Sequence, residues 1–151
     1  MTMQKIEDVK LSKIVYGGQA LGMLEDGKKV FVWGALPGET VKIKVTKSKK
    51  NWAEGIIEEV IGASEQRVRP EDPESFLSTS PWQIFDYDYE NTLKQELIID
   101  QFAQHELEIK LDGYAAPEEP YQYRNKVEFS FWWEKPENGD GQLDLAFYKR
   151  G

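Results

Sequence analysis

The sequence predicts a mainly β, α+β fold with a single helix. Two periodicities support this prediction: short β patterns follow one another from Ile6 to Ile61, and a helical period occurs once, after Asn91. The 151 residues are 40% hydrophobic and 13% aromatic, which is enough apolar material for a packed core. No apolar run approaches the roughly 20 residues that cross a bilayer, so a cytoplasmic protein without a membrane partner is expected.

Residues 1–64 are expected to form a closed five-stranded barrel of the OB type. In Val41–Val45 the strict alternation directs β-branched side chains inward and Lys42 and Lys44 outward. Trp52 to Ile61 supplies the last strand. The turns between strands use residues that accept or fix unusual backbone angles: Gly17-Gly18, Asp26-Gly27 and Pro37-Gly38.

Residues 65–90 are predicted to be an ordered but irregular connector. Pro70, Pro73 and Pro81 prevent a single regular element. The segment is also rich in side chains that are poorly suited to water: Phe76, Leu77, Trp82, Ile84, Phe85, Tyr87 and Tyr89. The connector is therefore expected to pack on another part of the chain.

Residues 91–151 are predicted to contain one helix and an antiparallel β-hairpin. Asn91 is the expected N-cap, and the helix is expected to end between His105 and Glu108. Its apolar face is assigned to Leu93, Leu97, Ile98 and Phe102. The hairpin is expected to present one apolar face formed by Val127, Phe129, Phe131 and Trp133 with Leu143, Leu145 and Phe147. A lone hairpin is marginally stable, so we expect either a fragment or a partner that covers this face.

The residue content excludes several kinds of site within this chain. It has no cysteine, and therefore no disulfide, thiolate-bound zinc, cysteine-ligated iron–sulfur cluster or cysteine nucleophile. It also lacks a strand, glycine-rich loop and helix unit for a cofactor. Glu71, Asp72 and Glu74 offer oxygen ligands for a divalent ion, but three acids between prolines more often form a solvated loop. The single His105 is expected at the surface, so no catalytic, cofactor-binding or metal-binding residue is assigned.

The net charge of -8 is distributed unevenly along the chain. Residues 1–62 carry ten Lys and eight acidic residues, a balance of +2, whereas the remainder carries a balance of -10. Only the first part is suited to the phosphates of RNA. The candidate contacts there are amines for phosphates and one indole for stacking a base: Lys42, Lys44, Lys47, Lys49, Lys50 and Trp52. The alternative is an ordinary solvated strand face with Trp52 in the core.

Two further groups near the C-terminal end are weaker candidates. Arg124 and Lys126 are assigned as RNA contacts, with an ion pair to Glu118 or Glu119 as the alternative. Trp132 and Trp133 are suited to stacking bases, but aromatic residues on hairpins are usually core, and the acidic surroundings disfavour RNA.

Three strings in the sequence carry a family resemblance. They are Gly17–Gly22 with Asp26–Glu39 (DGKKVFVWGALPGE), the basic stretch Lys47–Gly55 (KSKKNWAEG), and Tyr123–Val127 (YRNKV). Together they resemble the N-terminal part of bacterial S-adenosylmethionine-dependent RNA (uracil-5-)methyltransferases, the family that includes the 23S rRNA enzymes. Arg67–Pro70, Trp82-Gln83 and Leu93-Lys94 fit the same family more weakly, and Trp33 stands where proline is usual.

The resemblance implies a TRAM barrel that binds RNA, with ribosomal RNA expected before transfer RNA. It also implies that S-adenosylmethionine, the cysteine nucleophile and a general base belong to a catalytic domain absent from this chain, so the chain alone is not expected to be an enzyme. Many members carry a C-x5-C-x2-C cluster motif. Here Glu71 or Asp72, Leu77 and Ser80 stand at those places, and an iron–sulfur cluster is therefore not expected.

Two alternative functions remain open. One is a protein–protein interaction module that docks, or associates with itself, through the hairpin face of Phe129, Phe131 and Trp133. The other is a free-standing TRAM RNA chaperone, against which the long aromatic segment after Glu65 argues because a chaperone of this type needs only the barrel.

Overall fold

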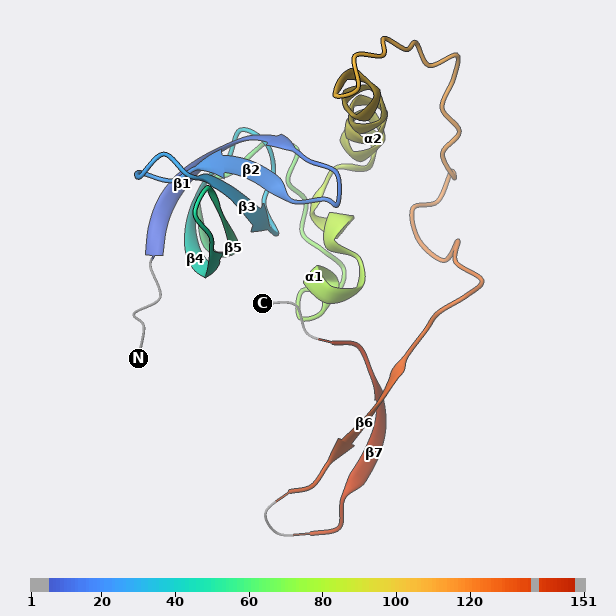
Figure 1. Cartoon of the computed structure of the whole chain (residues 1–151). Coiled ribbons are helices and arrows are strands. Elements are labelled where there is room, and N and C mark those ends of the chain that lie inside the picture. The colour runs from blue at the N-terminus through green and yellow to red at the C-terminus, as the bar shows by residue number, and fades with distance from the viewer. Residues whose placement is uncertain (1–5, 137–138, 149–151) are drawn as a thin grey trace.

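The computed structural model describes residues 6–136 and 139–148 and confirms a mainly β fold (Figure 1). Five strands form a closed barrel in the order β1-β2-β3-β5-β4. All neighbours pair antiparallel except β3 and β5, which are parallel, and the barrel closes where β1 pairs with β4. The strands are β1 (Ile6–Ile14), β2 (Ala20–Met23), β3 (Lys29–Trp33), β4 (Thr40–Ser48) and β5 (Trp52–Gly62).

The barrel interior is filled by small and branched aliphatic side chains. Val30 and Val32 of β3, Val41 and Ile43 of β4, and Ala53 of β5 are all fully buried. The predicted alternation of β4 is confirmed for these positions, whereas Val45 is only partly buried. Glycine makes the close packing possible, because a Cβ at Gly22 would lie 2.4 Å from Cγ1 of Val9.

The connector folds back on itself beside the barrel (Figure 1). Its two limbs meet where the N–H of Val68 donates to the carbonyl of Ile84 at 3.0 Å and the N–H of Asp86 donates to the carbonyl of Gln66 at 2.8 Å. Ile84 and Phe85 are buried, as expected for an ordered segment. It contains two short helical turns that the sequence did not predict, α1 (Phe76–Thr79) and η1 (Pro81–Ile84).

A buried ion pair fastens the connector to the barrel. Glu39, which directly precedes β4, is fully buried, and its carboxylate accepts bonds from Nε and Nη2 of Arg67 at 2.7 and 2.8 Å. The backbone N–H groups of Leu36 and Ser64 also donate to it. Burial alone would raise the pKa of Glu39, but these hydrogen bonds outweigh it and lower that pKa below its ordinary value.

The long helix α2 spans Tyr87–Ala103 and begins earlier than predicted. Asn91 is not the N-cap: the side chain of Asp86 accepts from the N–H groups of Asp88 and Tyr89, because it directly precedes the first turn. The start of the helix is hard to recognise in the sequence because the aromatic residues of the connector continue into its first turn.

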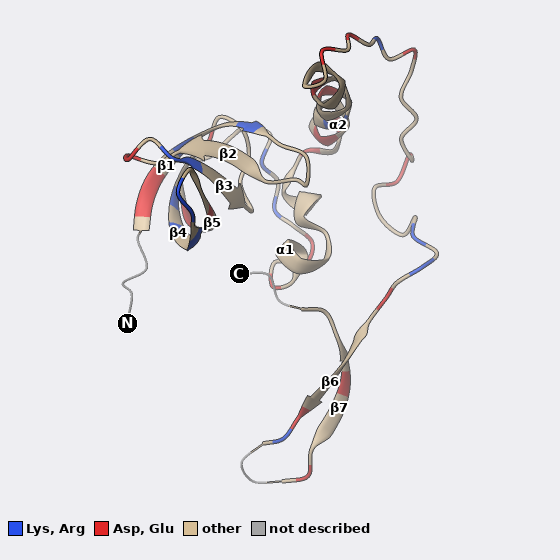
Figure 2. Ribbon diagram, in the orientation of Figure 1, with Lys and Arg blue, Asp and Glu red and all other residues tan. Residues whose placement is uncertain are grey.

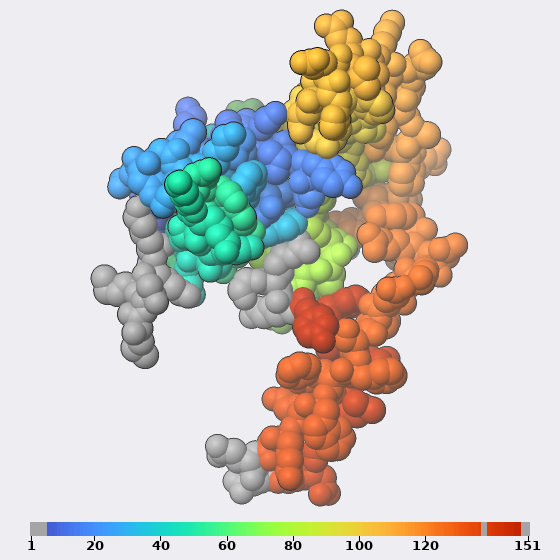
Figure 3. All heavy atoms as spheres, in the orientation of Figure 1, coloured from blue at the N-terminus to red at the C-terminus, as the bar shows by residue number. Residues whose placement is uncertain are grey.

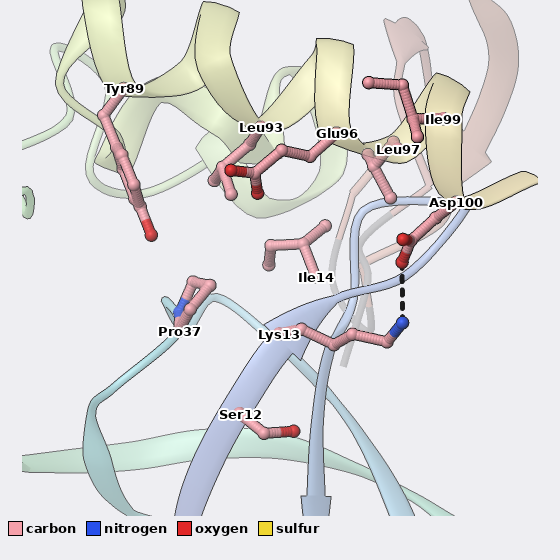
Figure 4. Close-up of a pocket in the computed structure, with 10 residues that line it drawn as sticks. All are labelled: Ser12, Lys13, Ile14, Pro37, Tyr89, Leu93, Glu96, Leu97, Ile99 and Asp100. Carbon is pink, nitrogen blue, oxygen red and sulfur yellow. Dashed lines mark hydrogen bonds and ion pairs between the residues drawn. The ribbon is translucent and has the colours of Figure 1, made fainter. Parts of the chain in front are cut away.

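Helix α2 leans against the barrel and leaves a cleft of about 390 Å³ between them (Figure 4). Leu93 is buried and faces Ile14 at this cleft, and Lys13 pairs with Asp100 at 2.6 Å across its rim. The predicted apolar face is correct only in part. Ile98 and Phe102 remain 38% and 43% exposed, because they line a second, open cavity beside Gly17 and Trp82.

The chain then runs as an extended segment to an antiparallel hairpin, which protrudes from the rest of the molecule (Figures 1 and 3). Its strands are β6 (Ser130–Glu134) and β7 (Gln142–Ala146), with Phe131 opposite Leu145 and Trp133 opposite Leu143. The predicted strand start at Val127 is wrong, since β6 has no partner before Ser130 among the described residues. Phe131 and Trp133 are 73% and 60% exposed. No helix in the described ranges is long and apolar enough to cross a membrane.

Candidate nucleic-acid interface

The outer surface of strands β3, β5 and β4 carries four of the eight sequence-predicted contacts, Lys42, Lys44, Lys47 and Trp52. We call it the β3–β5–β4 face and define it by Lys29, Phe31, Trp33, Lys42, Lys44, Lys47, Trp52, Glu54 and Ile56. All of these side chains except Lys47 alternate with buried residues of the same strands and therefore point outward. Lys47 follows an irregularity in the β4–β5 register and is itself exposed. Figure 2 shows Lys on β4 of this face, while acidic residues gather at the start of β1 and along α2.

Strand register sets the neighbours on this face. Lys29 lies opposite Trp52, Phe31 opposite Glu54, and Trp33 opposite Ile56 across the parallel β3–β5 pair. Across the β4–β5 pair, Glu54 lies opposite Lys47 and Ile56 opposite Lys44. Aromatic and basic side chains from three strands therefore share one surface.

Trp52 is the centre of an aromatic and cationic cluster. Its ring meets that of Phe31 edge to face, with centroids 6.2 Å apart. The ammonium of Lys47 lies 4.9 Å from the Trp52 ring centroid. Trp52 is therefore not part of the barrel core, and its alternative assignment there is wrong: the barrel interior beside it is occupied by Ala53.

Two of the predicted lysines are engaged with carboxylates. Lys42 pairs with Glu59 at 2.7 Å, and Lys47 pairs with Glu54 at 3.3 Å. The bond from Lys42 lowers the pKa of Glu59, and the same bond raises the pKa of Lys42. Both pairs are open to solvent, where ion pairs are weak and phosphate can compete for the amine. In the protein without RNA, these two ion pairs lower the positive potential of the β3–β5–β4 face but leave its lysines accessible to phosphate.

Lys49 and Lys50 lie at the tip of the β4–β5 hairpin. The N–H of Lys49 donates to the carbonyl of Trp52 at 2.8 Å, which fixes the turn. Both side chains are exposed. The β4–β5 hairpin therefore carries two exposed lysines close in the chain to Trp52.

Arg124 and Lys126 do not join this face. They lie on the extended segment that precedes the hairpin, away from the barrel (Figure 2). Lys126 pairs with Glu128 at 2.6 Å, and the Arg124 guanidinium lies 5.9 Å from the ring centroid of its neighbour Tyr123. Trp132 and Trp133 are exposed on β6 and are likewise separate from the lysine cluster.

The acidic residues of the connector form no metal site in the described part of the chain. Asp72 instead accepts bonds from the backbone N–H and the hydroxyl of Ser75. No group of three or more His, Asp or Glu side chains within the described ranges is placed to hold a metal ion. His105 is exposed, as predicted.

Phe31, Trp33 and Lys29 are members of the face that the sequence analysis did not assign. Four of the five residues in the run Lys29-Val30-Phe31-Val32-Trp33 are apolar, so polarity alone does not separate its outward from its inward positions. Its period of two was the available signal: Val30 and Val32 are buried, and the other three residues point outward.

Comparison with known proteins agrees with this architecture. The TRAM domain family model matches residues 4–57, which covers most of the barrel. An uncharacterized RNA methyltransferase of Thermotoga maritima is 31% identical over 147 residues, covering 93% of this chain and 33% of that protein. An uncharacterized RNA methyltransferase of Lactiplantibacillus plantarum is 30% identical over 149 residues, covering 97% of this chain and 31% of that protein.

A relative with a more specific name matches a shorter part. The 23S rRNA (uracil(1939)-C(5))-methyltransferase RlmD of Dichelobacter nodosus is 39% identical over 71 residues, covering 47% of this chain and 16% of that protein. The chain spans about a third of the length of the two RNA methyltransferases above. The chain therefore contains a TRAM domain and is similar, over nearly its whole length, to the N-terminal region of bacterial RNA methyltransferases.

Proposed function

We propose that this chain is the RNA-binding region of an RNA (uracil-5-)methyltransferase. In this proposal the barrel holds the RNA by its phosphates and presents it to a catalytic domain outside this chain. The observation that carries the proposal is the β3–β5–β4 face, where Lys29, Lys44 and Lys47 share one surface with half-buried aromatic rings. Amines beside aromatic rings are the combination that single-stranded nucleic acids require.

The methyl transfer itself is assigned to a domain outside this chain for a chemical reason. Attack at C6 of uracil needs a strong nucleophile such as a thiolate, and this chain has no cysteine. A site for S-adenosylmethionine is not available in the described residues either, because Gly17-Gly18 joins β1 to β2 and does not lead into a helix. The methyl donor would therefore bind to the catalytic domain, and an iron–sulfur cluster has no thiolate ligands here.

Ribosomal RNA is the proposed substrate class. The support is the name of the Dichelobacter nodosus relative, a 23S rRNA methyltransferase, together with the sequence resemblance described above. Contacts to phosphates carry no sequence information, so selection of one uridine would depend on other parts of the enzyme.

Salt-dependent binding tests this proposal. The chain is titrated against a labelled fragment of 23S rRNA at several salt concentrations, as wild type and as Lys49→Glu/Lys50→Glu. We expect the variant to bind more weakly and its plot of log K against log salt to be less steep by about 1.4, or 0.7 for each lost phosphate contact.

The matched control is Lys110→Glu/Lys135→Glu, which changes the net charge equally at exposed positions outside the barrel. It is expected to retain most of the wild-type affinity and slope. Absence of salt-dependent binding by the wild-type chain, or equal losses in the two variants, would contradict the proposal.

The exposed hairpin favours a second function, docking or self-association through Phe129, Phe131 and Trp133. All three are more than half exposed, at 51%, 73% and 60%. Analytical ultracentrifugation of the wild type and of Phe131→Ser tests it directly. A concentration-dependent dimer that Phe131→Ser abolishes would support this function, and a monomer at all concentrations would contradict self-association.

A further inference from the structure

The position of the rings on the β3–β5–β4 face is not explained by the barrel core. Phe31 and Trp52 lie on the outer side of strands whose inner positions are filled by Val30, Val32 and Ala53. Both rings are half-buried, by each other and by neighbouring side chains. An indole held at a strand edge in this way keeps part of its surface available to a ligand.

Lys47 marks the open side of the Trp52 ring. Its ammonium is 4.9 Å from the ring centroid and 3.3 Å from Oε1 of Glu54, and its side chain is 49% exposed. A cation–π contact and a solvent-exposed ion pair are both weak, so Lys47 is held loosely in this position. A flat ligand that stacks more favourably can displace it.

We propose that this face binds RNA as a single strand, with one base stacked on Trp52 in the place that Lys47 occupies in the free protein. The inference rests on the proposed function and specifies the form of its RNA. Phe31 supports the indole from its edge, and the displaced Lys47 turns to a phosphate of the bound strand. Lys29, which lies opposite Trp52, and the exposed Lys49 and Lys50 supply positive charge for the phosphates that flank the stacked base.

Single strands are selected because a stacking site cannot reach bases inside a duplex. Paired bases stack on one another and expose only their edges, whereas unpaired bases offer a free ring face. Lysines alone would bind both forms through their phosphates. Discrimination between the two forms is thus assigned to Trp52, with Phe31 as a positioning residue.

The test measures binding of a mixed-sequence 12-nucleotide RNA, single-stranded or annealed to its complement, by fluorescence anisotropy. Trp52→Leu is expected to weaken binding of the single strand by about 5- to 150-fold, which corresponds to the loss of one stacked base. Its salt dependence is expected to equal that of the wild type, since no amine is removed. Trp52→Phe, which keeps a ring, is expected to recover most of the affinity, and Trp132→Leu on the hairpin is the control for loss of an exposed indole.

A second measurement needs no variant and covers the case in which Trp52→Leu does not fold. The wild-type chain is crosslinked by ultraviolet light to RNA that contains 5-iodouridine, and the peptides are identified by mass spectrometry. A crosslink at Trp52 is expected. Crosslinks confined to other peptides would overturn the inference.

The remaining outcomes separate this inference from the proposed function. If Lys49→Glu/Lys50→Glu loses binding but Trp52→Leu does not, the stacking site is wrong and the RNA-binding role stands. Equal affinity of the wild type for single strand and duplex also overturns the inference alone. If neither RNA binds with a dependence on salt, the proposed function fails as well, and a protein partner becomes the occupant of this face.

Discussion

Removal of the Arg67 guanidinium is expected to destabilise the protein strongly. Arg67 donates at 2.7 and 2.8 Å to the carboxylate of Glu39, which is fully buried, and at 2.9 Å to the carbonyl of Gly34. In Arg67→Ala the Glu39 carboxylate would keep only the two backbone donors from Leu36 and Ser64. Its charge would then be buried without a counterion.

The magnitude follows from the burial of the two groups. Breaking a buried ion pair by removing one partner costs about 3–5 kcal/mol. The Arg67 side chain is 20% exposed, so water can partly replace it, and we expect a loss of about 3 kcal/mol. This is a large share of the roughly 5–15 kcal/mol by which a domain is stable. The melting temperature should fall by roughly 10 °C or more.

Urea denaturation followed by circular dichroism measures this loss, with Arg69→Ala as the matched control. Arg69 is exposed and lies two residues further along the connector. Its replacement is expected to change the free energy of unfolding by less than about 0.5 kcal/mol. Our reasoning about the ion pair would be refuted if the two variants had the same stability.

Three further predictions concern stability and pH. The folded-state pKa of Glu39 lies below its ordinary value of 4.5. The stability that its charge contributes is therefore complete above pH 4.5 and is lost as the pH falls through the lowered pKa. Urea titrations at several pH values should show this loss of stability in the wild type and not in Glu39→Gln. Asp86→Ala removes the side-chain acceptor at the start of α2 and should cost about 1 kcal/mol in the same assay, whereas a cost of zero would contradict the capping assignment. Gly38→Ala places a Cβ in open space but at φ 82°, so backbone strain alone should cost about 1 kcal/mol, and an unchanged melting temperature would argue against this turn geometry.

Features that depend on a few neighbouring residues were readable in the sequence. The alternation in Val41–Lys44 predicted which side chains of β4 face the core, and positive φ at Gly17, Gly27 and Gly38 confirms the predicted turns. The concentration of lysine in the first part of the chain predicts an RNA surface there, and the binding experiments proposed above test it. Backbone conformation and side-chain polarity decide these features locally.

Local rules were less reliable at the boundaries of elements. The sequence predicts the cap of α2 at Asn91, whereas the cap is Asp86, and it predicts an apolar strand face from Val127, whereas β6 begins at Ser130. In both cases a run of suitable residues extends past the true boundary. The boundary depends on which backbone groups find partners in three dimensions.

The sequence by itself determined the strands, the turns and the unequal distribution of charge, because each follows from preferences of adjacent residues. Only the tertiary structure decided which outward side chains meet. Closure of the barrel brings β3 beside β5 in parallel and thereby joins Phe31 and Lys29 to Trp52. The same register pairs Lys47 with Glu54, and the folding back of the connector joins Glu39 to Arg67. These contacts link residues far apart in the chain, so no local period encodes them.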